Sequence, residues 1–437
     1  MHFLSTGRPV KILDIFSRQR LCYNEYIMND ISELKTTTDV LACIETPFNC
    51  VTRADIAKHL ALSRTTVSTA VASLMQLGLV EEQPVIQDDT TAGRGRPGIP
   101  LKIRTDRWFA VGASFHTSTW FFVITDLTSK VVYKYSLKLS ELSVDLFLHN
   151  LIKGLKHVIK KCPGRLLPMI GVGVPGLVND KTGVILDAED LGWHNILLGE
   201  TILRHTGLPA VVLNRHRACA LAEAGFELHQ RADTFIYLGI DTGIIAAVIA
   251  NGRLLAGANH CAGEIGHTIV DPHGAICQCG KQGCLQAMAS LGALNRIIVE
   301  AYRADGNSFP NDDPFHRYLE KGLFIPGEAI MDAACYNHPV ALAALRRISK
   351  YLGLAIGNLV NLLNPQTIIL GGSLTFSRSE LLTEFVTAEV ARTAMAFPFS
   401  VVRILSSRLG IYSGAIGAAS LPLERKLELA LRVSSPT

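Results

Sequence analysis

Four residues with the side chains of metal ligands lie close together in this chain. His267 is followed by Cys277, Cys279 and Cys284. One imidazole and three thiolates have the composition of a closed tetrahedral zinc site, and soft sulfur ligands select zinc over magnesium or calcium. Four protein ligands leave no position for water, so we predict a structural Zn²⁺ in a loop of residues 263–285. The alternative is a set of unrelated reduced thiols, but the glycines between the cysteines favour a loop folded around one ion.

The composition limits the class of protein. The chain has 437 residues, 48% of them hydrophobic and 18% charged, so it is folded and too long for one ordinary core. The formal net charge is only +4, so binding to nucleic acid must come from a local patch rather than from total charge. No apolar run reaches the ~20 residues of a membrane span, and the N-terminus lacks the pattern of a signal peptide. With ten cysteines, which fit a reducing compartment, these features predict a cytoplasmic protein with no membrane contact.

The pattern of apolar residues divides the chain into three parts. Residues 1–35 carry no clear signal and are interpreted as an N-terminal arm of uncertain structure. Residues 36–105 show helical spacing and then two short strands. Residues 106–437 alternate strands with helices, which predicts an α/β body with mixed sheets.

The second part has the element order of a winged helix-turn-helix domain. Thr52 and Asp55 have the spacing of a capping box, and Ser63 is placed to cap a second helix that ends at Gly78. Two strands joined by a loop follow this helix. Helices followed by such a strand pair are typical of domains that place the second helix in the major groove of DNA.

The predicted DNA-contacting residues lie on this second helix and in the loop between the strands. Small hydroxyl side chains and an arginine allow a helix to approach base edges and phosphates closely. Arginines flanked by glycines can enter a narrow minor groove. The candidates are Ser63, Arg64, Thr65, Thr66, Ser68, Thr69, Arg94 and Arg96. An additional basic patch that could bind phosphates is predicted from Lys102, Arg104 and Arg107. The alternative is a helical hairpin used for protein contacts, but it would leave the loop arginines unexplained.

The zinc loop also carries a resemblance to a known family. Residues 264–267, the cysteine cluster and Leu285 resemble the signature of the ROK family, which contains repressors and sugar kinases. Two further segments resemble glycine-containing stretches of this family, residues 171–178 and 364–372. The resemblance covers residues 108–420, and the N-terminal domain is similar to that of the repressor branch. It implies a two-lobed, actin-like and sugar-kinase-like (ribonuclease H-like) body.

The chain departs from the sugar kinases of this family at three positions. Their first phosphate loop, Asp-x-Gly-Gly-Thr-Lys, is matched by residues 114–119, which have neither the carboxylate nor the glycines that let backbone amides bind phosphates. Their second loop is matched by residues 241–247, where Asp241 would repel a phosphate. Their general base is matched by Arg215, which cannot accept a proton. We therefore predict that the chain is not an enzyme and has no catalytic residue.

The sugar pocket of the family is only partly altered. The resemblance implies that Asn214, Glu264 and His267 contact a sugar, with one imidazole nitrogen on zinc and the other on a hydroxyl. Arg215 and Gln286 stand where the family has carboxylates, so the pocket is less acidic. A guanidinium can pair with a phosphate, which predicts a sugar or sugar-phosphate effector. The alternative is that these positions changed without functional consequence in an active site that is no longer used.

These features together predict a transcription regulator. We expect a repressor of genes for carbohydrate uptake or metabolism that binds a double-stranded DNA operator as a homodimer or homotetramer, because two-fold symmetry matches a palindromic site. One alternative is an ATP-dependent sugar kinase with a DNA-binding appendage. Another is a ROK body controlled by a partner protein.

Overall fold

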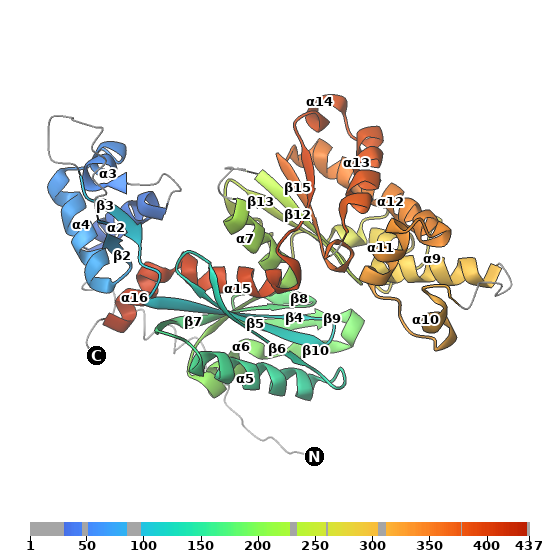
Figure 1. Cartoon of the computed structure of the whole chain (residues 1–437), viewed down its shortest axis with the longest axis horizontal. Helices are drawn as coiled ribbons and strands as arrows, with labels where there is room; N and C mark the ends of the chain where they lie inside the picture. Colours follow the sequence, from blue (N-terminus) through green and yellow to red (C-terminus); the bar gives the residue numbers. More distant parts are fainter. Residues whose placement is uncertain are drawn as a thin grey trace, which may run out of the picture. The chain divides into compact units, whose positions relative to one another are not determined.

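The computed structural model describes residues 30–45, 51–84, 98–227, 234–258, 261–304, 312–376 and 378–434. The chain divides into two compact units between Arg107 and Trp108, and each is described separately (Figure 1). Helix α2 begins at Asp30, so it includes part of the segment that sequence analysis assigned to the arm. Residues 1–29 of that arm lie outside the described residues.

The described residues of the N-terminal unit form three helices and a three-stranded antiparallel sheet with the order β1-β3-β2. Its elements are α2 (Asp30–Glu45), β1 (Val51–Thr52), α3 (Arg53–His59), α4 (Arg64–Leu77), β2 (Val80–Glu82) and β3 (Pro100–Ile103). The apolar faces of the helices meet in a core where Val40, Ile56, Val67 and Leu74 are fully buried. Burial of these side chains orients the opposite, polar face of α4 toward solvent.

Local sequence signals define the ends of α3 and α4. The Thr52 side chain accepts a hydrogen bond from the Asp55 backbone, and the Asp55 carboxylate accepts one from the Thr52 N–H at 3.0 Å. The Ser63 hydroxyl accepts a hydrogen bond from the Thr66 N–H at 3.0 Å. Gly78 ends α4 with φ 74, a left-handed conformation that glycine adopts without strain. The predicted capping box, N-cap and C-cap are confirmed.

The second unit begins with a lobe built on the mixed sheet β11-β7-β4-β5-β6, here called lobe I. Its elements are β4 (Trp108–His116), β5 (Thr119–Asp126), β6 (Val131–Lys138), α5 (Val144–Lys160), β7 (Arg165–Val174), β8 (Leu177–Asn179), β9 (Val184–Ala188), η1 (Glu189–Leu191), β10 (Trp193–Ile196), α6 (Leu198–Thr206) and β11 (Ala210–Asn214). The central strand β4 is apolar along its length and buried on both faces, whereas β6 at the edge alternates in burial. Helices α5 and α6 cover one face through Phe147, Leu151 and Ile202.

The rest of this unit forms lobe II around the mixed sheet β14-β13-β12-β15-β16. Its elements are β12 (Thr234–Ile240), β13 (Ile244–Ala250), β14 (Arg253–Leu254), η3 (Ile265–His267), α8 (Leu285–Ala289), α9 (Leu291–Ala304), α10 (His316–Glu320), α11 (Gly327–Cys335), α12 (Pro339–Leu363), β15 (Thr367–Gly371), η4 (Ser373–Thr375), α13 (Glu380–Thr393), α14 (Ala396–Phe399) and β16 (Arg403–Ser406). The short η5 (Gly410–Tyr412) that follows packs on β5 of lobe I. The long helix α12 packs with α8, α9, α11 and α13 on the core side of this sheet. Among the described helices, none has both the length and the apolar character that crossing a bilayer requires.

Two helices lie between the sheets of the lobes, α7 (Arg215–Glu227) and α15 (Ser413–Glu424) (Figure 1). Helix α7 packs on the sheet of lobe II, α15 packs on β4 and β7 of lobe I, and the two helices contact each other. A side chain on Gly171 would lie 1.7 Å from the Ala418 carbonyl oxygen, and one on Gly417 would lie 1.6 Å from that of Ala218. These glycines are therefore needed for close packing of helix on sheet and helix on helix. A final helix, α16 (Lys426–Ser434), follows α15.

Candidate functional site

A cavity of about 290 Å³ lies between the two lobes of the second unit. Lobe I contributes the turn after β7, the end of β9 and the junction of β11 with α7, and lobe II contributes the β12–β13 turn, η3 and the first turn of α8. The structure brings all five predicted effector-binding residues to this cavity: Asn214, Arg215, Glu264, His267 and Gln286. Its size lies near the lower end of the range for small-molecule pockets, about 300–1,000 Å³.

Asn214, the last residue of β11, is held by hydrogen bonds within lobe I. Its side-chain amide donates to the Gly176 carbonyl oxygen at 2.9 Å, and its side-chain oxygen accepts from the His216 N–H at 2.9 Å. Because a carboxamide has two donor hydrogens and two acceptor lone pairs, one of each remains for a ligand. Asn214 therefore fixes the wall of the pocket and can still bind a hydroxyl.

Glu264 and Gln286 form the opposite wall. Burial raises the pKa of the Glu264 carboxyl, and His267 and Arg217 oppose that shift. The Gln286 side-chain oxygen accepts a weak hydrogen bond from the Ile244 N–H at 3.4 Å. Arg217, which sequence analysis did not single out, is 5% exposed and supplies positive charge near Glu264.

Arg215 does not present a free guanidinium to the pocket. Its Nη2 donates a short hydrogen bond to Oδ2 of Asp241 and lies 3.0 Å from Nε2 of His216. The Asp241 carboxylate therefore matches its charge. Sequence analysis expected this charge to pair with an anionic group of the effector. In the structure its partner is a carboxylate of the chain itself. The pairing was not predicted because the two residues come from different lobes.

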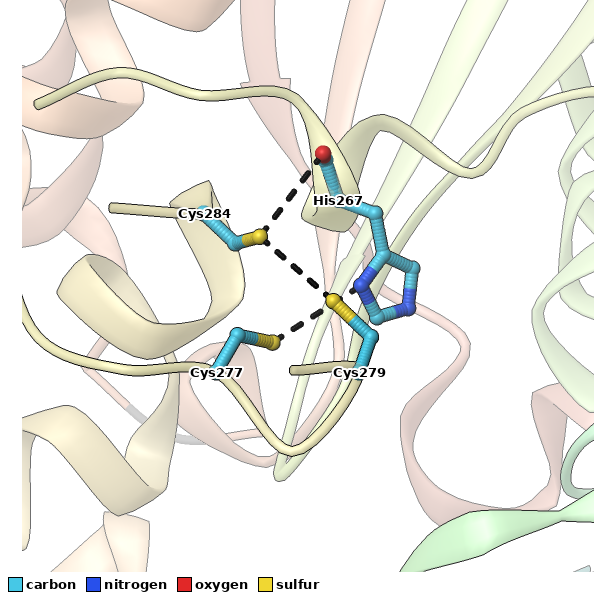
Figure 2. Close-up of side chains that lie close together, drawn as sticks. All are labelled: His267, Cys277, Cys279 and Cys284. Atoms are coloured by element: carbon cyan, nitrogen blue, oxygen red, sulfur yellow. Dashed lines mark hydrogen bonds between the residues drawn. The ribbon is translucent and has the colours of Figure 1, made fainter. Parts of the chain in front are cut away.

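The four predicted zinc ligands meet beside the pocket (Figure 2). The sulfurs of Cys279 and Cys284 are 3.7 Å apart, and the sulfur of Cys277 lies 3.8 Å from Nδ1 of His267. All four ligand atoms lie within 4.8 Å of one another. Tetrahedral bonds of about 2.3 Å would place neighbouring sulfurs about 3.8 Å apart, so the residues fit a Zn²⁺.

The electrostatics of the thiols also favour a bound cation. Burial raises the pKa of Cys284 to about 12 and raises that of Cys277. A hydrogen bond from the Lys281 backbone lowers the pKa of Cys279 to about 7. Because burial disfavours thiolates, the three thiols ionise together only with a positive ion among them.

His267 belongs both to the group of four candidate metal ligands and to the pocket wall. Its Nδ1 faces the sulfurs, and its other ring nitrogen points away from them (Figure 2). The residue also lines the cavity. The arrangement therefore allows one nitrogen to bind the metal while the other contacts a ligand hydroxyl, with the metal fixing the orientation of the ring.

Most of the predicted DNA-contacting residues lie at the N-terminal end of α4. Arg64, Thr65, Ser68 and Thr69 are exposed, and Arg64 forms no ion pair with any described residue. The exposed Ser63 and Thr66 cap the helix, and their hydroxyl oxygens lie 2.8 Å apart, so they shape the helix end as well as being accessible. Arg94 and Arg96 lie outside the described residues.

The prediction of a basic patch after this helix is wrong, because carboxylates lie beside its positively charged side chains. The register of β2 and β3 pairs Glu81 with Lys102, whose charged atoms are 2.9 Å apart. Arg104 bonds Asp106 at 2.7 Å and also lies 3.8 Å from Glu81. One cross-strand pair and one local pair therefore offset the charges of two of the three predicted phosphate contacts.

The sequence pattern of the ROK family matches residues 118–425, which is more than half of the chain. The chain belongs to the ROK family. The pattern of the MarR family matches residues 36–89, within the N-terminal unit. The predicted fold, a winged helix-turn-helix domain followed by a ROK body like that of the sugar kinases, is confirmed.

Related proteins include repressors and kinases. The xylose repressor of Bacillus subtilis is 29% identical over 381 residues, covering 87% of this chain and 92% of the repressor. A crystal structure of a ROK family transcriptional regulator, a homologue of the Escherichia coli MLC protein, has a TM-score of 0.76 at 26% identity and covers 92% of this chain and 98% of that one. A glucokinase of Halalkalibacterium halodurans is 32% identical over 257 residues, covering 58% of this chain and 75% of the kinase. The matches to regulators thus extend over much more of this ROK chain than the match to the kinase.

Proposed function

We propose that this ROK family chain is a DNA-binding transcription regulator, a repressor of genes for carbohydrate uptake or metabolism. The observation that carries the proposal is its likeness to regulators over nearly the whole chain. The candidate recognition helix also exposes Arg64, which forms no ion pair within the described part of the chain. The N-terminal unit would bind a double-stranded operator. A homodimer or homotetramer would present two such units to an inverted repeat.

The ROK body is proposed to bind an uncharged sugar in the pocket between its lobes. Asn214, Glu264 and His267 offer acceptors and donors for hydroxyl groups, and Asp187 adds a further carboxylate to the wall. Arg215 is already paired with Asp241, so nothing in this set favours a phosphate over a hydroxyl. Zn²⁺ is proposed to hold the loop that carries Glu264 and His267, and a change in lobe placement on binding would alter the affinity for DNA.

Replacing Arg64 by alanine is expected to weaken operator binding by about tenfold or more, because a side chain that contacts a base edge contributes about 1–3 kcal/mol. Random DNA should lose less affinity, since it is held mainly through phosphates. The measurement is a titration of labelled operator and of a scrambled duplex at one salt concentration.

A matched control for this variant is Gln76→Ala. Gln76 is exposed on the same helix near its C-terminal end, away from the end that enters the groove in helix-turn-helix domains. The control should bind the operator like the wild type. Equal losses on operator and scrambled DNA for Arg64→Ala would show that Arg64 does not read bases.

A further inference from the structure

Three substitutions that distinguish this chain from the sugar kinases lie in one buried cluster. His116 ends β4, Arg215 begins α7, and Asp241 follows β12. Oδ2 of Asp241 accepts a short hydrogen bond from Arg215, and its Oδ1 lies 3.5 Å from Nε2 of His116. His216 adds a ring nitrogen 3.6 Å from the same carboxylate. The segments that match the two phosphate loops and the general base of the kinases therefore converge on a single carboxylate.

This carboxylate is anchored in lobe II. Oδ1 of Asp241 accepts a hydrogen bond from the Ser373 N–H at 2.7 Å, just after β15. The backbone of Asp241 donates to the Gly243 carbonyl at 2.9 Å and accepts from the Leu291 N–H at 2.9 Å. These bonds connect Asp241 to the β12–β13 turn, to α9 and to η4. Asp241 is therefore a fixed part of lobe II.

The partners of this carboxylate also contact lobe I, although α7, which begins at Arg215, packs on the sheet of lobe II as well. His116 belongs to the central strand β4, and its ring also meets the edge of the Phe376 ring in lobe II, with centroids 5.6 Å apart. The backbone of Arg215 follows β11 directly and packs on the close-fitting Gly173 of β7. Each partner therefore links the sheet of lobe I to lobe II.

Burial makes the partners depend on one another. The side chains of Arg215 and Asp241 are 11% and 9% exposed. Burial alone would raise the pKa of Asp241, but Arg215, His116 and His216 together outweigh that effect, so the pKa lies well below its usual range. Burial and the Arg215 charge lower the pKa of His216 to about 3, so His216 is neutral. A buried charge left without its partner is costly, so unrelated drift at separate positions does not account for a set of matched charges.

We propose that His116, Arg215 and Asp241 form an inter-lobe clasp, which holds the two lobes together at the place where the kinases of the family bind nucleotide phosphates. The clasp keeps the sugar pocket formed without any nucleotide. The clasp needs no bound sugar, so it can be tested independently of the proposed function.

Hydrogen exchange of the full-length chain tests the clasp without a ligand. In Asp241→Asn and in Arg215→Met, amides on both sides of the cleft are expected to exchange at least about tenfold faster, in residues 116–119 of lobe I and 372–376 of lobe II. Helices α5 and α12, in the separate cores of the lobes, should keep their wild-type exchange.

The matched control is Asp313→Asn. Asp313 is 4% exposed, lies 3.0 Å from His338 and accepts a hydrogen bond from the Phe315 N–H at 2.8 Å, all within lobe II. This variant also removes a buried carboxylate with a histidine partner. It should increase exchange near residues 313–316 and 338–341 and leave residues 116–119 unchanged.

The double variant Arg215→Met with Asp241→Asn separates the clasp from general loss of stability. It leaves no unpaired charge, so it should melt at a higher temperature than either single variant while both sides of the cleft still exchange fast. Wild-type exchange at residues 116–119 in the double variant would overturn the proposal. So would faster exchange confined to residues 241–243 in Asp241→Asn.

Discussion

Replacing Cys279 by serine is expected to release about one equivalent of zinc and to destabilise the ROK body. The loss in free energy of unfolding should be at least about 3 kcal/mol, a fraction of the roughly 10–16 kcal/mol that zinc contributes to small zinc domains. The loop from Gly263 to Cys284 carries the pocket residues Glu264 and His267, so sugar binding should weaken as well. Metal analysis and denaturant unfolding of the full-length chain measure both effects.

A cysteine outside the cluster provides the control for this experiment. Cys335 is a partly buried free thiol of α11, so Cys335→Ser changes the same atom without touching a proposed ligand. It should retain the metal and most of the stability. Wild-type protein purified without zinc, or equal stability of the two serine variants, would refute the zinc site.

Phosphoryl transfer from ATP to hexoses or amino sugars is expected to be absent. Arg215 stands where the base of the kinases would be, and it cannot accept the proton of a sugar hydroxyl. Asp241 places a buried negative charge where a phosphate would bind. It is held there by hydrogen bonds from Arg215 and from the Ser373 N–H, and His116 lies beside it. A coupled assay with a ROK family glucokinase as the positive control should therefore give no signal above background.

Restoring the base alone is not expected to restore this activity. In Arg215→Asp, residues 114–119 still carry no glycine for close backbone contact with phosphates, and two carboxylates would face each other. Turnover by the wild-type chain near the usual kinase range of about 1–100 s⁻¹ would show that the chain is an enzyme.

Signals that act over a few residues could be predicted from the sequence. The caps at Thr52 and Ser63 and the left-handed Gly78 depend on neighbours within three or four positions, and the structure confirms them. The four candidate metal ligands are also close in sequence, and glycines between them favour a loop that brings them together. Such features can be predicted without knowledge of the tertiary fold.

Features that depend on register or on the meeting of two lobes could not be predicted in this way. Lys102 was expected to contact phosphates, but the antiparallel register places Glu81 beside it. Arg215 was expected to bind an anionic effector, but the fold brings Asp241 to it from the other lobe. Each substitution was interpreted alone. The structure shows that the side chains of His116, Arg215 and Asp241 lie together in one cluster.

The most direct test of the central claim is selection of genomic DNA fragments by the purified full-length chain, with Arg64→Ala selected in parallel. The account predicts that the wild type enriches fragments that contain an inverted repeat beside genes for carbohydrate uptake or metabolism, and that an uncharged sugar related to those genes releases them. The variant should enrich these fragments weakly. Retention of random fragments to the same extent by both proteins, or no enrichment at all, would contradict the assignment of this ROK family chain as a sequence-specific regulator.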